Sequence, residues 1–326
     1  MRSCLLLVTL AIGALSADLA AAASGKLVLY TSQPNEDAQS TVDAFNQRYP
    51  DVEVEWIRDG TTKVMAKLRA ELAAGAPQAD VLLIADTVTM EALKQEDLLL
   101  AYPEAPTDGY PDGLHDPDGY YFSTKLITTG IVYNNEAPMQ PTSWHDLVAA
   151  DAKDLVTMPS PLTSGAAAIH IAALTSNPEF GWSYIEDLAA NGVVPQGGNG
   201  AIFKAVAQGE KLYGMVIDYL PIREAAKGSP VTFVFPKEGV TAVTEPVAIL
   251  STAHNPEAAK AFVDFLLSRE GQELAARQGY LPAHPEVAPP EGFPPRDEIV
   301  LMGFDPAAAL ANDEANKARF VELFGQ

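Results

Sequence analysis

The sequence VVPQGGNGAIFKAVAQGEKLYGMVIDYL, residues 193–220, combines a glycine-rich turn, an amphipathic helix and a short apolar strand. Between residues 201 and 206, apolar side chains recur at helical spacing. Residues 213–217 are mostly apolar, as in a strand whose sheet is covered on both faces. A helix followed by a buried strand is the repeating unit of α/β proteins, so this stretch predicts an α/β fold.

Two features of this stretch point to a ligand. Asn199 stands at the expected start of the helix, where unpaired N–H groups favour an anion. Asp218 and Tyr219 directly follow the strand, and ligands of open α/β sheets bind beside the carboxyl ends of the strands. Such an acidic–aromatic pair could hold an ammonium group or a metal ion. Taken alone, the stretch is better explained as an ordinary βα unit with a glycine turn.

Strands and helices alternate in the same way along the rest of the chain. Near the N-terminus, strands are predicted at residues 26–31, 52–56 and 79–84, and helices at residues 36–49, 63–74 and 88–95. This order is typical of an open parallel sheet flanked by helices. Further strands are predicted at residues 155–158, 231–235 and 242–251, and further helices at residues 179–191, with Asn177 as cap, and 256–267, with Asn255 as cap.

The composition describes an acidic globular protein. The chain has 326 residues, of which 48% are hydrophobic and 20% charged, and it is long enough for two domains. Its net charge is −22, and removal of residues 1–23 leaves this value unchanged because Arg2 and Asp18 are lost together. Such a chain is not expected to bind nucleic acid or an anionic membrane surface. A small anion remains compatible with it, since backbone amides and helix ends set the local field of a pocket.

Residues 1–23 are predicted to be a secretory signal peptide. Arg2 gives a positive start, residues 5–15 form an apolar core, and residues 21–23 are small, as a cleavage region requires. The apolar core is too short to span a bilayer and no other apolar run approaches that length, so no membrane insertion is expected. The sole cysteine, Cys4, lies in this segment, and the mature chain would have no disulfide. A large secreted chain without disulfides is predicted to reside in a bacterial periplasm.

The sequence lacks signatures of catalysis and of metal binding. No two of its five histidines stand at metal-ligand spacing, and it has no HExxH zinc motif. It also has no GxSxG nucleophile elbow and no GxxxxGK[ST] phosphate loop. We therefore predict no catalytic residue, no metal site and no cofactor.

Small polar side chains recur where a predicted strand ends and a helix begins. They are Ser32-Gln33, Thr61-Thr62, Thr163-Ser164-Gly165 and Asn199. Hydroxyl groups and free N–H groups at helix N-termini bind anions. Each group alone is more simply explained as a helix cap. Because four such groups come from both halves of the chain, we hypothesise that they share one pocket for an oxyanion.

The order of motifs resembles one protein family along nearly the whole mature chain. The motifs are LVLYTSQ, YPDVEVEW, ADVLLIAD, DPDGYYF followed by TGIVYNN, SPLTSGAAA, the glycine-rich turn and HNPEAAKAFVDFLLSREGQE. They are similar to those of periplasmic solute-binding proteins of ABC transporters, in the cluster that holds ferric-iron, sugar-phosphate and phosphonate binders. The chain most resembles 2-aminoethylphosphonate-binding proteins.

This resemblance implies an α/β fold of the two-lobe periplasmic binding protein type (type II), in which each lobe is a mixed sheet flanked by helices. Lobe one would comprise residues 24–128 and 248–326, and lobe two residues 129–247. Two hinge crossings are expected, near residues 125–133 and 243–250. The lobes would close over the ligand by hinge motion.

Two segments bear on the ligand. Iron binders of this cluster resemble one another in an adjacent tyrosine pair late in lobe two and in an early histidine or glutamate. Here Asp218 precedes Tyr219, and the early loop SQPNEDAQ has no histidine. The segment DYLPIREAAKGSPVTFVFPKEG is instead similar to binders of organophosphates and of 2-aminoethylphosphonate.

Carried over to this chain, the resemblance implies ligand-binding residues in both lobes. They are Ser32, Gln33, Thr61 and Thr62 in lobe one, and Thr163, Ser164, Gly165, Ala166, Asn199, Asp218 and Tyr219 in lobe two. The four residues 163–166 would cradle the phosphonate oxygens, and Asn199 would add a donor. Asp218 or Glu36 would pair with a ligand ammonium group, and Tyr219 would pack or hydrogen-bond. The nearest basic candidates, Lys125 and Arg223, are expected to be exposed surface charges.

The sequence thus predicts a periplasmic receptor that is monomeric and not an enzyme. It would capture a small phosphonate, with 2-aminoethylphosphonate as the first candidate, and deliver it to the permease subunits of an ABC transporter. A ferric-iron receptor or a sugar-phosphate receptor of the same fold is the alternative. A secreted hydrolase is the alternative from another class of function.

Overall fold

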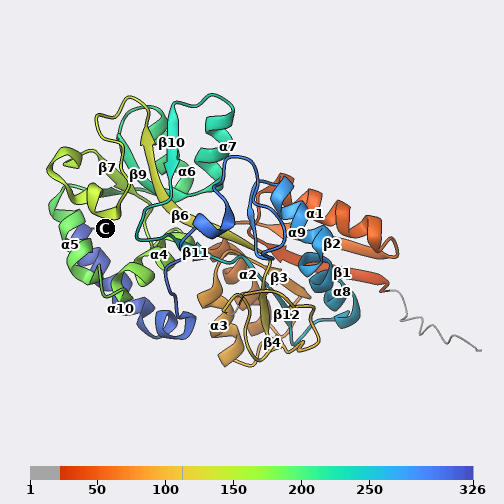
Figure 1. Cartoon of the computed structure of the whole chain (residues 1–326). Coiled ribbons are helices and arrows are strands. Elements are labelled where there is room, and N and C mark those ends of the chain that lie inside the picture. The colour runs from red at the N-terminus through yellow and green to blue at the C-terminus, as the bar shows by residue number, and fades with distance from the viewer. Residues whose placement is uncertain (1–22, 112, 326) are drawn as a thin grey trace, which may run out of the picture.

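The chain folds into two α/β lobes that lie side by side (Figure 1). The computed structural model describes residues 23–111 and 113–325. Apart from Ala23, the predicted signal peptide lies outside these residues. None of the described helices is both long and apolar enough to cross a bilayer.

The sheet of lobe one is mixed, because two parallel pairings meet an antiparallel strand from later in the chain. Its strands are β1 (Gly25–Thr31), β2 (Val52–Arg58), β3 (Val81–Leu83), β4 (Leu99–Leu100), β5 (Tyr121–Ser123) and β12 (Pro246–Leu250). They lie in the order β2-β1-β3-β12-β4, with β5 also paired to β12. β1 runs parallel to β2 and β3, whereas β12 is antiparallel to β3, β4 and β5. The helices of this lobe are α1 (Asn35–Arg48), α2 (Thr61–Ala73), α3 (Thr87–Gln95), α8 (Pro256–Leu267) and α9 (Arg269–Arg277).

The sheet of lobe two is also mixed. Its strands are β6 (Lys125–Asn134), β7 (Val156–Met158), β8 (Val194–Pro195), β9 (Tyr213–Ile217) and β10 (Val231–Val234), in the order β10-β6-β9-β7-β8, and β11 (Thr241–Val243) and β13 (Leu281–Pro282) pair with β6 as well. The predicted buried strand β9 runs parallel to β7 but antiparallel to β6. The helices are α4 (Gly165–Ser176), α5 (Gly181–Ala190), α6 (Asn199–Ala207), α7 (Tyr219–Ala226) and the 3₁₀ segments η1 (Trp144–Val148) and η2 (Ala150–Ala152). The chain ends with a 3₁₀ turn, η3 (Arg296–Glu298), and with α10 (Pro306–Phe324).

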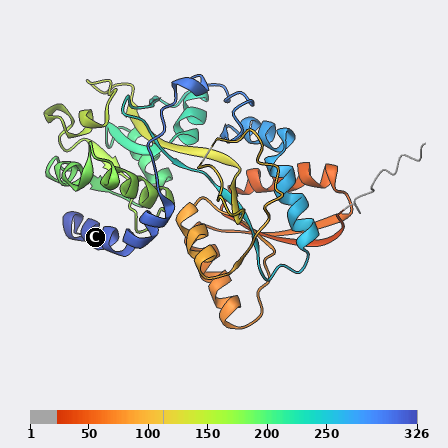
Figure 2. The same cartoon turned by 60° about the horizontal axis from the view of Figure 1, so that its bottom comes forward.

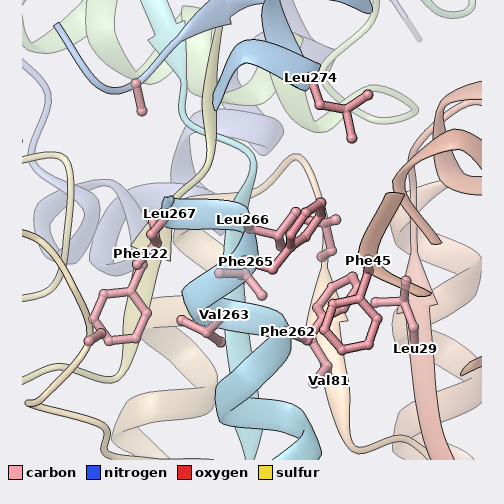
Figure 3. Close-up of a cluster of buried hydrophobic side chains, with 14 of the residues drawn as sticks. Leu29, Phe45, Val81, Phe122, Phe262, Val263, Phe265, Leu266, Leu267 and Leu274 are labelled. Carbon is pink, nitrogen blue, oxygen red and sulfur yellow. The ribbon is translucent and has the colours of Figure 1, made fainter. Parts of the chain in front are cut away.

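Helix α8 supplies the centre of the lobe-one core, as its amphipathic pattern predicts (Figure 3). Phe262 and Phe265 are fully buried. Both rings meet Phe45 of α1 edge to face, with centroid distances of 5.0 and 5.7 Å. The predicted cap is confirmed, since the Asn255 side chain accepts a hydrogen bond from the Ala258 amide at 3.2 Å. The edge-to-face aromatic contacts thus tie α1 and α8 together on one face of the sheet.

Two segments cross between the lobes, as the fold type requires. The first runs from β5, which pairs with β12 in lobe one, into β6, which pairs with β9 and β10 in lobe two. The second runs from β11, which pairs with β6, into β12. Figure 2 shows β6, in yellow, and the β11–β12 segment, in teal, passing together from one lobe to the other. At the crossings, the Thr124 hydroxyl donates to the Glu245 carbonyl at 2.8 Å, so the two segments are tied to each other.

The last helix contacts both lobes. α10 packs against α3 of lobe one and against α4 and α5 of lobe two. Its Phe320 is fully buried in a cluster with Trp144 and Ile185 of lobe two. Residues 306–324 therefore pack with the lobe-two core, although the sequence predicted them for lobe one. The predicted lobe boundaries after residues 128 and 247 stay a proposal; the strands change sheets at residues 124 and 244–245.

Two predicted elements differ in detail from the structure. The strand predicted at residues 242–251 is two strands, β11 and β12, because the chain turns at Glu245 with a φ of +33°. The helix predicted to follow Asn177 begins only at Gly181. The Asn177 side chain instead accepts a hydrogen bond from the Glu179 amide at 2.9 Å, which closes a local turn.

Phe262→Ala is expected to lower the free energy of unfolding by about 3–5 kcal/mol, because it opens a cavity among aromatic rings that cannot collapse onto it. Urea denaturation measures the change. Val300→Ala, at a side chain that is 55% exposed, serves as the control and should change the free energy by less than about 0.5 kcal/mol. Equal effects of the two substitutions would contradict the central role of α8 in the core.

Candidate functional site

A cavity of about 680 Å³ opens between the lobes, and both lobes and both crossings contribute to its wall. From lobe one it is lined by Ser32, Pro34, Arg58, Asp59, Gly60, Thr61, Thr62, Lys63 and Ala85; from lobe two by Leu162, Thr163, Ser164, Gly165, Ala166, Gly198, Asn199, Ile217 and Tyr219; and from the crossing strands and the segment before β13 by Ile127, Val243, Glu245 and Tyr280. A volume in this range is typical of sites for small organic ligands.

Most of the residues predicted from sequence meet in this cavity. Ser32, Thr61, Thr62, Thr163, Ser164, Gly165, Ala166, Asn199 and Tyr219 all line it, whereas Gln33 and Asp218 do not. The reason is topological. The lining residues stand at loops where strands such as β1, β2, β7 and β9 give way to helices, and both sheets direct these loops toward the space between the lobes.

Four helices begin at this cavity. α1, α2 and α6 start after Pro34, Gly60 and Gly198, and none of these residues caps its helix with a side chain. α4 starts after Ser164, whose Oγ accepts a hydrogen bond from the Ala167 amide at 3.3 Å. The first N–H groups of a helix have no partner within the helix, and they carry the positive end of its dipole. Their convergence makes the cavity attractive to an anion, even though the protein as a whole is acidic.

On the lobe-two side, Ser164 and Asn199 act together. The Asn199 side chain donates from Nδ2 to Ser164 Oγ at 3.3 Å and accepts at Oδ1 from the Ile217 amide at 3.1 Å. The prediction that Asn199 is the N-cap of α6 was therefore wrong, because its side chain holds the end of β9, and Gly198 occupies the cap position. Ser164 Oγ accepts two hydrogen bonds, so its own proton can be donated to a ligand in the cavity.

Two further hydroxyls differ in what they can offer. Ser32 Oγ accepts a hydrogen bond from the Ala85 amide at 2.9 Å, which leaves the Ser32 proton for a ligand. Thr163 Oγ1 donates to the Gly197 carbonyl at 2.9 Å, so its proton is already used. Thr163 therefore holds two loops of the wall together, and at residues 163–166 the donors left for an anion are the Ser164 hydroxyl and the amides at the start of α4.

Asp218 is placed away from the cavity, contrary to its predicted contact with a ligand ammonium group. It is fully buried, and its Oδ2 accepts hydrogen bonds from the amide and the hydroxyl of Thr128 at 2.9 and 2.7 Å. Its Oδ1 accepts from the Tyr219 amide at 2.7 Å. The two bonds from Thr128 tie the start of α7 to β6, and the bond from Tyr219 caps α7. The other predicted partner, Glu36, is exposed on α1 and does not line the cavity either.

Gln33 also lies outside the lining. Its side chain is 2% exposed, and its backbone carbonyl accepts a hydrogen bond from Arg58 Nε at 2.6 Å. Gln33 therefore positions the arginine rather than the ligand, since Arg58 is one of the residues that line the cavity. Lys63 is a second cation in the wall, beside Asp59, with 3.5 Å between Nζ and Oδ1.

Neither Arg58 nor Lys63 was identified from the sequence. Arg58 is the last residue of β2, at the same edge of the sheet as the predicted Thr61, and its position after a strand was the available signal. The predicted basic candidates lie elsewhere. Lys125 was expected to be exposed but is 2% exposed and paired with Glu245, with 2.6 Å between Nζ and Oε2. Arg223 stacks over the rings of Tyr219 and Tyr280, at 4.6 and 4.7 Å from their centroids.

The aromatic part of the wall is neutral at physiological pH. Tyr219 and Tyr280 contact each other with a centroid distance of 4.7 Å. Burial raises the pKa of Tyr219 to about 12, and burial also raises the pKa of Tyr280. The Tyr280 hydroxyl donates to Asp37 on α1, which favours its protonated form further. Among the described residues, one group of histidine and acidic side chains is spaced to hold a metal ion, His145, Glu179 and Glu238, and it lies outside the cavity.

Asp218→Asn is expected to change how stability depends on pH. Burial raises the pKa of Asp218 to about 6, above the value of about 4 for an exposed aspartate. Between these values the native state binds the proton more tightly than the unfolded chain, so the contribution of this carboxyl to the free energy of unfolding falls as the pH rises. Over that window the variant should gain about 2–3 kcal/mol relative to the wild type, measured by urea denaturation at several pH values. Parallel pH profiles of the two proteins would contradict this assignment.

Comparisons with known proteins agree with this architecture. Residues 40–299 match the family model described as bacterial extracellular solute-binding protein. An uncharacterised protein from Haemophilus influenzae is 30% identical over 277 residues, which are 79% of this chain and 77% of that protein.

Solved structures of similar fold include binding proteins for different solutes. The periplasmic binding protein AfuA from Actinobacillus pleuropneumoniae, solved with fructose-6-phosphate bound, is 26% identical with a TM-score of 0.79, and the match covers 92% of this chain and 99% of that one. Iron-bound HitA from Pseudomonas aeruginosa has a TM-score of 0.77 at 21% identity and covers 90% of this chain and 99% of its own, which shows the shared fold. Since the family match spans most of the chain and the two-lobe fold agrees with it, this protein belongs to the bacterial extracellular solute-binding proteins.

Proposed function

We propose that the protein is the periplasmic receptor of an ABC transporter for a small phosphonate, with 2-aminoethylphosphonate as the first candidate. Its lobes would close over the ligand at the two crossings and deliver it to the permease subunits of the membrane transporter. The observation that carries this proposal is the convergence of four helix N-termini with free hydroxyl protons on one cavity.

A phosphonate or phosphate group suits this wall because it offers several anionic oxygens at one end of a ligand. Donors are available in the amides at the start of α2 and α6, which have no side-chain cap, and in the hydroxyls of Ser32 and Ser164. Arg58 and Lys63 add positive charge at the lobe-one side. Hydrogen bonds from fixed donors to an anion are strong in a closed cleft from which water is excluded.

The rest of the wall favours an organic ligand over inorganic phosphate. Ile127, Ile217 and Val243 form an apolar surface, and Tyr219 and Tyr280 add two aromatic rings. A cavity of about 680 Å³ exceeds what a phosphate ion fills, so an inorganic ion would leave this surface in contact with water. A carbon chain attached to the phosphorus would cover it.

A sugar phosphate is the second candidate, supported by one specific observation. The AfuA structure, at 26% identity and over 92% of this chain, holds fructose-6-phosphate. The carboxylates of Asp59 and Glu245 and the amide of Asn199 in the present wall are groups that could accept or donate hydrogen bonds to sugar hydroxyls. Ferric iron has less support, because burial keeps the phenols of Tyr219 and Tyr280 protonated and iron prefers anionic oxygen ligands.

Titration calorimetry of the mature protein should separate these candidates. We expect 2-aminoethylphosphonate to bind at one site per chain. Inorganic phosphate should bind at least about tenfold more weakly, because it leaves the apolar part of the wall in contact with water. A hexose phosphate and ferric citrate complete the panel. Binding of the hexose phosphate alone would favour the second candidate, and a visible tyrosinate-to-iron absorption band would overturn the proposal.

Ser164→Trp is expected to abolish ligand binding without unfolding the protein. Ser164 stands before α4 at the cavity wall, so an indole there would fill the space of the anion. Ser176→Trp, at the exposed C-terminal end of the same helix, is the matched control and should bind as the wild type does. Calorimetry measures binding and thermal unfolding measures stability. Wild-type affinity in the Ser164 variant would remove α4 from the binding site.

A further inference from the structure

Glu245 has no role in the proposed binding of the phosphonate group, although it lines the same cavity. It lies at the turn between β11 and β12, where the second crossing passes between the lobes, and it is one of the residues that line the cavity. Its φ of +33° belongs to the left-handed region, which residues other than glycine rarely adopt. Residues in such conformations persist where surrounding contacts hold them, and they are frequent in ligand-binding sites.

The surroundings hold this carboxylate firmly. The Thr124 hydroxyl donates to the Glu245 backbone carbonyl at 2.8 Å. Glu245 is 2% exposed, and Lys125 Nζ lies 2.6 Å from its Oε2. Burial raises the pKa of Glu245, while the Lys125 ammonium and the Gln33 side chain favour its charged form. A buried carboxylate at the cavity wall is thus compensated by a buried cation rather than by solvent.

The loops and the crossings contribute chemically different side chains to the cavity wall. The anion donors Ser32, Ser164 and Asn199 come from loops and helix starts of the two lobes. Glu245 comes from a crossing, as do the apolar side chains Ile127 and Val243. A ligand with phosphorus at the helix starts would therefore direct its other end toward the crossings.

We propose that Glu245 is the specificity-determining residue for the end of the ligand remote from phosphorus, where it accepts a hydrogen bond from an ammonium group. The inference rests on the proposed function, since it requires that the phosphorus end binds at the helix starts. It replaces Asp218 and Glu36 in that role. The other carboxylate of the wall, Asp59, already accepts from the Gly60 amide at 2.7 Å and lies beside Lys63.

Lys125 is the neighbour that affects how Glu245 can accept a hydrogen bond from a ligand ammonium group. Its Nζ is paired with Oε2 and lies 3.8 Å from the centroid of the Tyr280 ring, so an aromatic face stabilises the cation as well. The pair balances the charge of Glu245 before a ligand enters. An incoming ammonium group then shares the carboxylate with Lys125, whereas a methyl group at the same place would make no hydrogen bond to it.

The test compares three ligands that differ only at the remote end, namely 2-aminoethylphosphonate, 2-hydroxyethylphosphonate and propylphosphonate, against the wild type and Glu245→Gln. We expect the variant to bind 2-aminoethylphosphonate about 30-fold more weakly and propylphosphonate within about threefold of the wild type, because only the charged end loses its partner. Glu36→Gln, which removes an exposed carboxylate outside the cavity, should leave all three affinities unchanged.

A second variant guards against loss of folding. Glu245→Gln leaves Lys125 buried without a counter-charge, which can destabilise a protein. Lys125→Met combined with Glu245→Gln removes both charges, and we expect it to fold and to show the same selective loss for the aminated ligand. Thermal unfolding of each variant is recorded beside the calorimetry.

The outcomes distinguish this inference from the proposed function. If the wild type binds none of the three phosphonates, the proposed function fails and the role of Glu245 fails with it. If the wild type binds them and the folded variants lose the same factor for 2-aminoethylphosphonate and propylphosphonate, the proposed function stands and the role of Glu245 is overturned. A selective loss for the aminated ligand supports both.

Discussion

The pairing of β6 with β11 sets the geometry on which the cavity depends. The two strands lie side by side over Thr129–Thr241, Thr128–Ala242 and Ile127–Val243, just after the chain enters lobe two and just before it leaves. Because the crossings are hydrogen-bonded to each other, the two lobes are joined by a short pair of strands, residues 127–129 and 241–243. The loops at the strand ends of both sheets then lie on either side of this strand pair, and the cavity is the space between these loops.

A buried ion pair, Lys125 with Glu245, lies where the two crossings meet. Lys125 and Glu245 are both about 2% exposed, so each would be costly without the other. Loss of one partner of a buried pair costs on the order of 3–5 kcal/mol, whereas replacement of both by apolar groups is often close to neutral. The pair is therefore weak evidence for stability, but it specifies how the two crossings align, and it places one carboxylate at the cavity.

The cavity also shows how an acidic protein can attract an anion. The chain carries a net charge of −22, yet the wall includes the starts of α1, α2, α4 and α6, and its two carboxylates, Asp59 and Glu245, are matched by two cations, Arg58 and Lys63. Partial charges at helix ends act over the first turn, and surface charges farther away are screened within about 8–10 Å. The local field of the cavity is consequently separate from the overall charge, which governs only longer-range encounters.

The sequence by itself determined the α/β class, most element positions and the polar groups at strand ends, because apolar periodicity and helix-start chemistry are local properties of the chain. Nine predicted residues met in one cavity for this reason. Only the tertiary structure decided which charged side chains face that cavity. Asp218 lies away from it because Thr128, 90 residues earlier, donates two hydrogen bonds to its carboxylate, and Glu245 lines it because it stands at the turn between β11 and β12, which belong to different sheets. The placement of such side chains depends on partners that are remote in sequence, and a local sequence pattern does not reveal these partners.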